Sequence, residues 1–367
     1  MEYRFDDILE IKNGKNQKAV ENPEGCYPIY GSGGVIGYAN DYICEADTVI
    51  IGRKGSINNP IYVSEPFWNV DTAFGLSVKT DLVLPKYLYY FCKKFDFEKL
   101  NKTVTIPSLT KSDLLKIKIT VPDKKEQQAI IDKLMKIESI IAHRKEELNC
   151  LDLLIKARFV EMFGDPEINS KNLPVIPMTE TCEIIDGDRG KNYPTQDDFL
   201  DEGYCLFLNA KNVTTNGFSF ENCMFVTKEK DEILRKGHLN RGDIVLTTRG
   251  TIGNLAFYDD SVPFENVRIN SGMVILRMNH DIVTEYFFIE QFKMQLASIK
   301  ERIASGSAQP QLPISIMNKI MVLMPDVRQQ EQFADFVKQV DKSKLAVQKS
   351  LEKTQQLFDS LMQKYFG

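Results

Sequence analysis

The chain has 367 residues, of which 43% are hydrophobic and 26% charged, so it can form two or three domains with their own cores. No apolar run approaches the ~18 residues that span a membrane, and the start of the chain lacks the basic-then-apolar order of a signal peptide, so we expect a cytoplasmic protein without a membrane partner. The seven cysteines form no Cys-x-x-Cys pair, which argues for reduced, mostly buried thiols and against a metal centre or a disulfide framework.

The net charge is −5, whereas domains that bind nucleic acid usually carry a basic surplus. Most of the acidic excess lies in residues 165–325, which hold 16 basic and 22 acidic side chains. Any attraction for a polyanion must therefore come from local clusters of basic residues and not from the field of the whole chain.

Residues 1–121 predict a compact α+β domain. β-Branched and aromatic residues favour short strands, and a later segment favours a helix with an aromatic face. The strands are expected at 27–30, 48–51, 61–63 and 74–78, and the helix at 85–100. The loops 31–34, 52–56 and 101–107 are polar or contain glycine; each serves equally well as a ligand contact or as a plain turn.

Residues 122–164 predict one long amphipathic helix, which follows a strand at 117–121. Its apolar residues alternate by steps of four and three, which is the pattern of a coiled-coil seam, and Arg144 and Arg158 interrupt it. The seam residues are Ile130, Leu134, Ile137, Ile141, Leu148, Leu151, Ile155 and Met162.

Residues 165–367 repeat this plan as a second α+β domain (165–324) and a second long helix (325–367). Residues 106–164 laid on 309–367 give 13 identities in 59 positions. A period of about 200 residues indicates a duplicated domain and helix, not a stacked array. The second seam consists of Phe333, Val337, Val340, Val347, Leu351, Phe358, Leu361 and Tyr365, with Lys344 and Thr354 as its polar interruptions.

Local motifs extend the duplication into the domains. Residues 47–53 align with 243–249, so that Arg53 and Arg249 each follow a strand, and Tyr87 aligns with Tyr286 at the start of a helix. The polar loops between these motifs differ. Two binding domains with different targets require such a pattern, although drift after duplication also produces it. The four polar seam residues are expected to fix the register of the paired helices.

No catalytic constellation stands out. The three histidines are scattered, and the glycines of 31–34 form neither a P-loop nor a dinucleotide fingerprint. The tetrapeptide at 59–62, Asn-Pro-Ile-Tyr, lacks the second proline of the amino-methyltransferase signature. We therefore predict a chain without a catalytic site, a metal ion or a cofactor.

Residues 117–127 and 320–330 share a strand, a proline, a short spacer and a Glu/Gln-Gln pair that opens a long heptad helix. This order resembles the specificity subunit of type I restriction-modification systems. The resemblance implies two α+β target-recognition domains (1–121 and 165–324) and two long spacer helices (122–164 and 325–367) that pair as an antiparallel coiled coil. It also implies a non-catalytic subunit in which each domain recognises one half of a bipartite DNA site.

The partners that the resemblance implies are double-stranded DNA, two methyltransferase (modification) subunits docked on the helices, and endonuclease/translocase subunits. The methyltransferase subunits would bring S-adenosylmethionine, which this chain itself is not expected to bind. A helix of about 40 residues is ~60 Å long, or roughly 17 base pairs, so two separated half-sites suit the proposed spacer.

The expected DNA contacts are polar and basic side chains of the loops, since arginine can bind guanine edges and hydroxyl or amide groups can bind phosphates or adenine. In the first domain they are Ser32, Arg53, Lys54, Ser56, Asn69, Thr103 and Thr105. In the second they are Arg189, Asn209, Lys211, Asn212, Arg249, Thr251, Asn270, Ser307, Gln309 and Gln311.

The alternative is a two-domain coiled-coil scaffold that binds protein and no DNA, which the acidic balance favours. The two classes differ in surface potential: a concave basic strip shared by both domains, on one side of the helix pair, favours DNA, whereas two acidic concavities do not.

Overall fold

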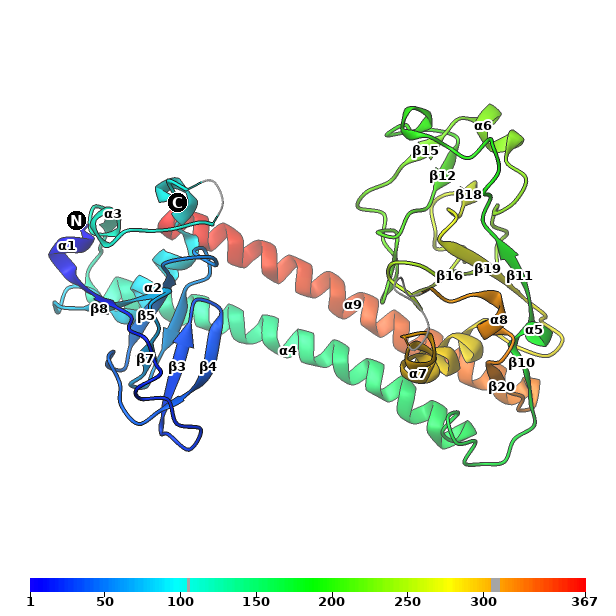
Figure 1. The fold of residues 1–367 in the computed structure, drawn as a ribbon, viewed down its shortest axis with the longest axis horizontal. Coiled ribbons are helices and arrows are strands. Elements are labelled where there is room, and N and C mark those ends of the chain that lie inside the picture. Colours follow the sequence, from blue (N-terminus) through cyan, green and yellow to red (C-terminus); the bar gives the residue numbers. More distant parts are fainter. Residues whose placement is uncertain (104–105, 305–310) are drawn as a thin grey trace. The chain divides into compact units, whose positions relative to one another are not determined.

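The computed structural model describes residues 1–103, 106–304 and 311–367, which form two compact units (Figure 1). Unit 1 consists of Met1–Glu146 and Val347–Gly367, and unit 2 of Glu147–Ala346. The boundaries between the two units, at 146/147 and 346/347, fall within the two long helices. Each long helix therefore contributes one part to each unit. Among the described residues, no helix is both long enough and apolar enough to span a membrane.

Unit 1 is built on an antiparallel core sheet with the strand order β2-β8-β5-β6 and a smaller sheet with the order β4-β3-β7. The strands are β1 (Glu2–Arg4), β2 (Leu9–Asn13), β3 (Tyr27–Gly31), β4 (Gly34–Ala39), β5 (Thr48–Gly52), β6 (Ile61–Val63), β7 (Trp68–Asn69), β8 (Ala73–Val78) and β9 (Lys118–Thr120). The helices are α1 (Phe5–Ile8), α2 (Pro85–Lys94), η1 (Phe97–Leu100), α3 (Lys111–Leu114) and α4 (Lys124–Phe163). The four strands predicted for the first domain are confirmed.

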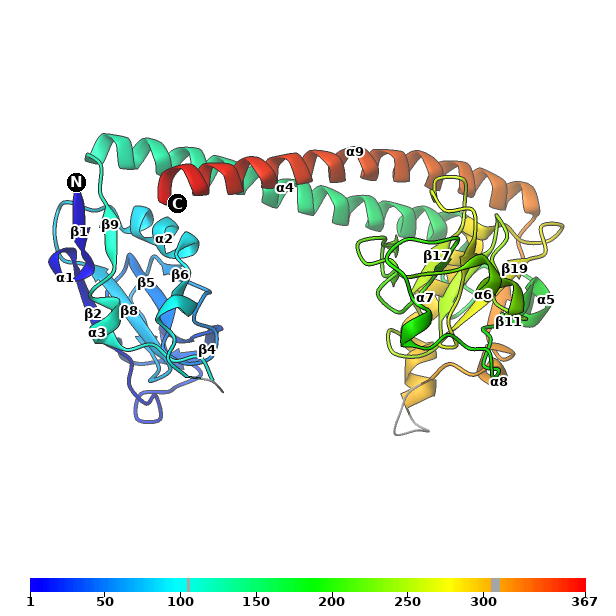
Figure 2. The ribbon, with the colours of Figure 1, turned by 90° about the horizontal axis from the view of Figure 1, so that it is seen from above.

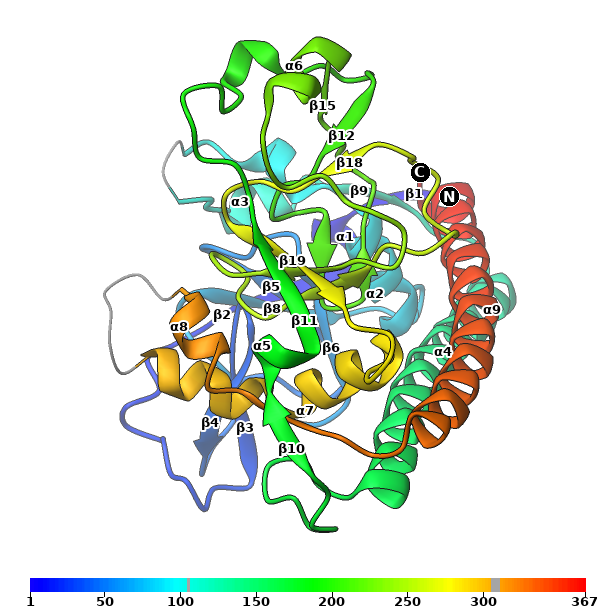
Figure 3. The ribbon, with the colours of Figure 1, turned by 90° about the vertical axis from the view of Figure 1, so that its right-hand side faces the viewer.

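Unit 2 repeats both sheets, with the orders β11-β19-β16-β17 and β15-β12-β18. In Figure 3, β11 lies beside β19, with which it pairs over five residues. The strands are β10 (Val175–Pro177), β11 (Cys182–Asp186), β12 (Cys205–Phe207), β13 (Val213–Thr214), β14 (Gly217–Phe218), β15 (Phe225–Val226), β16 (Ile244–Thr247), β17 (Leu255–Phe257), β18 (Val267–Arg268), β19 (Met273–Met278) and β20 (Met321–Leu323). The helices are α5 (Met178–Thr181), η2 (Gln196–Asp198), α6 (Lys228–Ile233), α7 (Glu285–Ala304), α8 (Ile314–Met317) and α9 (Val327–Phe366).

The hydrogen bonds of the core sheets show which residues of the two units are equivalent. The backbone N–H of Lys54 donates to the Thr72 carbonyl oxygen (3.3 Å), and that of Arg249 donates to the Gly272 carbonyl oxygen (3.2 Å). The glycine after each basic residue has a positive φ, 80° and 71°. Lys54 is therefore the counterpart of Arg249, and the predicted alignment of Arg53 with Arg249 is wrong by one residue.

Helices α2 and α7, which are equivalent, show the same one-residue correction. The Tyr87 ring packs on Phe366 with centroids 5.0 Å apart, and the Phe287 ring packs on Phe163 at 4.9 Å. Phe163 and Phe366 are equivalent in the duplicated long helices, so the counterpart of Tyr87 is Phe287 and not Tyr286. In Figure 2, α2 lies between the core sheet of unit 1 and the long-helix segments of that unit.

The two long helices pair antiparallel within each unit, as predicted. In unit 1, Ile141 near the middle of α4 and Phe358 near the end of α9 share one core, and in unit 2 the Phe159 ring lies 5.4 Å from Phe333. All predicted seam residues are buried or half-buried. Burial of both stripes against each other supplies the apolar contact that a long helix needs in water.

The polar seam residues contact the opposite helix. The Arg144 guanidinium donates to the Ser350 carbonyl oxygen (2.6 Å) and to the Thr354 hydroxyl, and the Lys344 ammonium lies 2.6 Å from the Asp152 carboxylate. These contacts fit one register only, since a shift by one turn would separate the partners. Arg158 makes an ion pair on its own helix with Glu161, and its guanidinium lies over the Phe336 ring of α9.

A buried glutamine locks the start of each long helix. The Gln127 side chain accepts from the Leu84 N–H (2.8 Å) and donates to the Leu82 (2.8 Å) and Pro122 (2.9 Å) carbonyl oxygens. Gln330 makes the same three bonds in unit 2, to Thr284 (3.0 Å), Ile282 (3.0 Å) and Pro325 (3.0 Å). Both side chains are fully buried, so the glutamine in each duplicated motif joins its helix to its own domain.

Replacing Gln127 with alanine should destabilise unit 1 by about 1–3 kcal/mol, because the part-buried Leu84 N–H and two carbonyl oxygens lose their partner. The matched control is Gln128→Ala, since the Gln128 side chain is exposed and, among the described residues, hydrogen-bonds only to Asp132 on the same helix. Thermal and urea unfolding of the full chain measures the stability of both variants. Equal unfolding curves for the two variants would contradict this role of Gln127.

Candidate functional site

The loops predicted to bind a ligand gather at one end of each core sheet, which we call the loop end. In unit 1, β2 and β5 both run toward the start of β8 and end there. The chain beyond β2 stays at this end, since the Gly14 N–H donates to the Ala73 carbonyl oxygen (3.2 Å). The chain beyond β5 does the same through Arg53, whose N–H donates to Thr72 (2.7 Å).

In unit 2 the loop end brings together predicted residues that are far apart in the sequence. The Arg189 guanidinium donates to the Ser271 carbonyl oxygen (3.3 Å), next to Asn270. The Arg249 side chain donates through Nε to Gln311 Oε1 (3.1 Å), and these two residues also form a backbone bridge. Thr251 is exposed in the same turn as Arg249.

Unit 1 has the corresponding arrangement with different side chains. Lys54 is exposed and forms a backbone bridge with Ser108, which is the counterpart of the bridge between Arg249 and Gln311. Ser56 is exposed in the turn after Lys54, and Ser32 lies beside Gly52 at the end of β5. The same backbone frame therefore presents an ammonium group in one unit and a guanidinium group in the other.

Four more predicted residues, Arg53, Thr103, Asn209 and Lys211, also have exposed or half-buried side chains. The Thr103 hydroxyl donates to Asn101 Oδ1 (2.8 Å), and the Arg53 guanidinium lies over the Phe74 ring at 5.7 Å. Lys211 is exposed beside Asn209 in the loop after β12. That loop is tied to the turn before β17, because the Asn254 side chain donates to the Val213 carbonyl oxygen (2.9 Å).

Two predicted contacts have side chains that do not reach the surface. Asn69 is fully buried and its amide donates to the Ala73 carbonyl oxygen (3.2 Å). Asn212 is 1% exposed and its amide donates to the Ser219 and Asn222 carbonyl oxygens, both at 3.0 Å. The Asn69 amide holds the turn between β7 and β8, and the Asn212 amide joins the loop after β12 to the chain after β14. Thr105, Ser307 and Gln309 lie outside the described residues.

Sequence reasoning missed a basic hollow at the loop end of unit 2, with a volume of about 400 Å³. Its lining consists of Asp186, Gly187, Asp188, Arg189, Gly190, Arg235 and Lys236. Only Arg189 was among the predicted contacts. The adjacent pair Arg235 and Lys236 was the available signal, but its position next to β11 depends on the tertiary fold.

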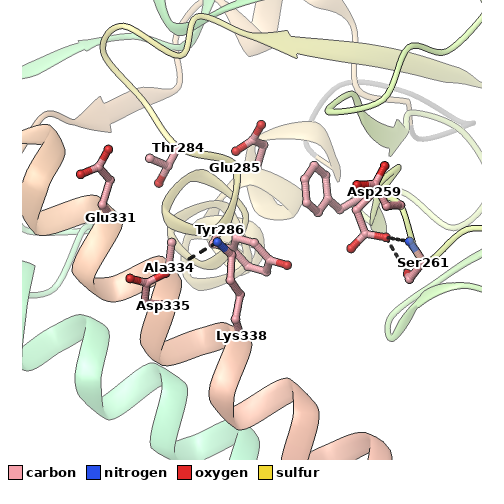
Figure 4. A pocket seen from close by; sticks show the side chains of 11 residues that line it. Asp259, Ser261, Thr284, Glu285, Tyr286, Glu331, Ala334, Asp335 and Lys338 are labelled. Carbon is pink, nitrogen blue, oxygen red and sulfur yellow. Dashed lines mark hydrogen bonds and ion pairs between the residues drawn. The ribbon is translucent and has the colours of Figure 1, made fainter.

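An acidic cleft of about 610 Å³ lies at the opposite end of the same sheet, where β17 ends and α7 and α9 begin (Figure 4). Five of its lining residues are acidic, Asp259, Asp260, Glu285, Glu331 and Asp335, and one is basic, Lys338. Burial raises the pKa of the Tyr286 hydroxyl in this cleft to about 12. Unit 2 therefore has an acidic end next to the long helices and basic groups at its loop end, so a polyanion is favoured at the loop end.

One group of side chains in unit 2 has the composition of a metal site. Cys205, Asp231 and His238 place one possible ligand atom each within 4.8 Å of one another. The Asp231 carboxylate already binds the buried Arg268 guanidinium (2.7 Å), and burial raises the pKa of the Cys205 thiol. A fixed guanidinium charge and a protonated thiol both oppose a cation here, so this cluster is better explained as a buried ion pair.

Two equivalent glycines shape the loop end. A Cβ on Gly14 would lie 1.8 Å from the Val70 carbonyl oxygen, and a Cβ on Gly187 would lie 2.2 Å from the Asn270 carbonyl oxygen. These contacts are shorter than any allowed approach, so the backbone at each position admits glycine alone.

Gly14→Ala should therefore destabilise unit 1 by about 1–3 kcal/mol, because either the loop or residue 70 must move. Gly33→Ala is the control, since its Cβ would meet no atom within 4 Å. Thermal unfolding of both variants checks this. A melting temperature of Gly14→Ala that equals that of the control would show that the loop adapts without cost.

A family model described as the type I restriction modification DNA specificity domain matches residues 1–150 and 172–357. A protein of Mycoplasma pneumoniae, provisionally named as the N-terminus of a type I specificity subunit, is 27% identical over 135 residues, which are 35% of this chain and 72% of that protein.

Two solved structures share the fold over the whole chain. The crystal structure of a type I restriction-modification S subunit from M. genitalium has a TM-score of 0.64 at 20% identity and covers 100% of this chain and 96% of that chain. A structure from work on the assembly and conformational transition of the type I R-M system has a TM-score of 0.57 at 14% identity, with 100% and 97% covered.

Proposed function

Since the chain belongs to the type I restriction-modification DNA specificity family, we propose that it recognises a bipartite DNA sequence, with one half-site bound at the loop end of each domain. The two domains are those expected from the sequence, 1–121 and 165–324. The chain supplies recognition and no catalysis, and partner subunits supply the adenine methylation and the DNA cleavage.

The observation that carries this proposal is the matched position of Lys54 and Arg249. Both follow the third strand of a core sheet in its spatial order, both precede a glycine with positive φ, and both bridge to a polar residue, Ser108 or Gln311. Arginine can bind a guanine edge with two parallel hydrogen bonds, whereas lysine acts as a point charge. The two domains thus place different cationic side chains, an ammonium and a guanidinium, at the same backbone position. This difference suits two domains that recognise different base sequences.

The proposed contacts are the predicted residues whose side chains are exposed or half-buried in the structure. They are Ser32, Arg53, Lys54, Ser56 and Thr103 in the first domain, and Arg189, Asn209, Lys211, Arg249, Thr251, Asn270 and Gln311 in the second. Asn69 and Asn212 are left out because their amides are buried. The basic groups at the loop end supply the local charge that binding to DNA requires in a chain with a net charge of −5.

We assign the docking of two methyltransferase subunits to the long helices. Several apolar side chains of these helices lie off the seam and are exposed: Leu153 (63%), Leu345 (55%) and Leu357 (52%). Exposed apolar groups on otherwise polar helices favour a protein partner, which would cover them. Endonuclease/translocase subunits would join this complex, and S-adenosylmethionine would bind to the methyltransferase subunits.

Arg249→Ala should weaken recognition of the half-site bound by the second domain, and Lys54→Ala that of the half-site bound by the first domain. The test is co-expression of the chain with its methyltransferase subunit, followed by mapping of the methylated adenines genome-wide. Each variant should accept substitutions in one half of the methylated sequence and keep the other half unchanged. An equal loss at both halves would contradict recognition by separate domains, and complexes that neither bind nor methylate DNA would favour the protein scaffold.

Arg249→Lys separates base recognition from charge. The lysine keeps the positive charge but not the two parallel donors, so binding to unrelated DNA should stay within about twofold while the preference at one base pair falls by roughly tenfold. Competition binding with cognate and single-mismatch duplexes measures both quantities. A uniform loss on all duplexes would instead identify Arg249 as a phosphate contact.

A further inference from the structure

We propose that the basic hollow formed by residues 186–190, Arg235 and Lys236 binds one phosphate of the DNA backbone in the half-site of the second domain. This inference rests on the proposed function and deepens it, because it assigns a sequence-independent contact to side chains that the sequence pattern did not single out. A phosphate here would fix the position of the duplex against the base-contacting residues Arg249 and Gln311.

The carboxylates of the hollow are already occupied. The Asp188 side chain is 6% exposed and accepts from the backbone N–H groups of Gly190 and Arg235, both at 2.7 Å. These bonds lower the pKa of Asp188, so the carboxylate stays ionised and fastens the loop after β11 to the chain after α6. Asp186 is held by Arg189, with an Nη2 to Oδ1 distance of 3.0 Å.

The cations, by contrast, remain available. The Arg235 side chain is 77% exposed, and its guanidinium comes no nearer than 3.9 Å to Asp188. Lys236 is exposed, and its ammonium has no hydrogen bond or ion pair within the part of the chain that the structure describes. Arg189 keeps further donors beyond its bonds to Asp186 and Ser271. Three cationic groups thus surround a hollow whose two carboxylates are already bonded.

The hollow is also preorganised. The Lys236 carbonyl oxygen accepts from the buried Arg268 guanidinium (2.6 Å), which in turn binds Asp231. A Cβ on Gly190 would lie 2.7 Å from the Arg235 guanidinium, so glycine at this position lets the guanidinium lie over the loop. These bonds fix the backbone that carries the cations, so the backbone loses little freedom when an oxyanion enters, which favours a phosphate contact at this place.

The equivalent loop of unit 1 is cationic as well. The ends of β2 and β11 pair with equivalent residues of β8 and β19, so the loop that begins at Gly14 corresponds to the loop that begins at Gly187. It carries the exposed residues Lys15 and Lys18. Both domains therefore place positive charge after the first strand of the core sheet, although their base-contacting loops differ.

The test uses the full chain in complex with its methyltransferase subunits and the DNA duplex defined by methylation mapping. Affinity is measured at several salt concentrations for the wild type, for Arg235→Gln with Lys236→Gln, and for Gly190→Ala. The double variant should bind cognate and unrelated duplexes more weakly by the same factor, roughly tenfold at low salt, and the slope of log K against log salt should fall by about 1. Gly190→Ala should act in the same direction, because it displaces the Arg235 guanidinium.

The control is Lys228→Gln, an exposed lysine of α6 that lies outside the hollow, 3.9 Å from Glu232. It should leave both the affinity and the salt slope unchanged. An unaltered salt slope in the double variant, while the wild type still recognises its sequence, would overturn the phosphate site and leave the proposed function standing. A loss confined to certain base sequences would overturn it too, because it would show base contact. A wild-type complex without sequence-specific binding would instead refute the proposed function itself.

Discussion

Each recognition domain is held between the start of one long helix and the end of the other. In unit 1 the start of α4 is fixed by Gln127, and the end of α9 packs Phe366 on Tyr87. In unit 2 Gln330 fixes the start of α9, and Phe163 at the end of α4 packs on Phe287. Neither domain completes its core with its own long helix alone, because the end of the other long helix covers the apolar face of α2 in unit 1 and of α7 in unit 2. The fold therefore requires both copies of the duplicated unit, because each domain needs the long helix of the other copy.

This constraint separates the two ends of each core sheet. The end next to the helices carries the packing that the two units share and, in unit 2, an acidic cleft. In the part of the chain that the structure describes, the loop end takes no part in the helix contacts, so its side chains can differ between the domains without a change in the core. The opposite end differs between the units as well. There the buried ion pair of Asp243 with Arg277 (2.9 Å) occupies the place of the hydrogen bond between Thr48 and Ser77 (2.9 Å) in unit 1.

The sequence predicted the parts of the fold that have a strong period or a long repeat. The seams of the two helices, the strands of the first domain and the duplication all follow from patterns over many residues, and the structure confirms them. The sequence alignment failed where one residue matters. Hydrogen bonds across the sheet, and not the similarity of side chains, show that Lys54 corresponds to Arg249, because a shift of one residue in a strand moves a side chain to the opposite face.

The candidate site was harder to predict for a similar reason. Asn69 and Asn212 look like surface amides in a polar loop, but the backbone turns them inward, where they bond to carbonyl oxygens. The hollow lined by Arg235 and Lys236 is formed by segments about 45 residues apart in the chain, and no local pattern brings them together. Polar residues of the same type can therefore either support the fold or contact a ligand, and only the tertiary structure shows which role a given residue has.

The most direct test of DNA recognition at the loop ends is photochemical crosslinking of the assembled complex to its own DNA sequence, with photoreactive bases placed in each half-site. We predict that peptides containing residues 53–56 crosslink to one half-site and peptides containing residues 249–251 to the other. Crosslinks to the acidic cleft around Glu285 and Asp335, or to the same domain from both half-sites, would contradict it.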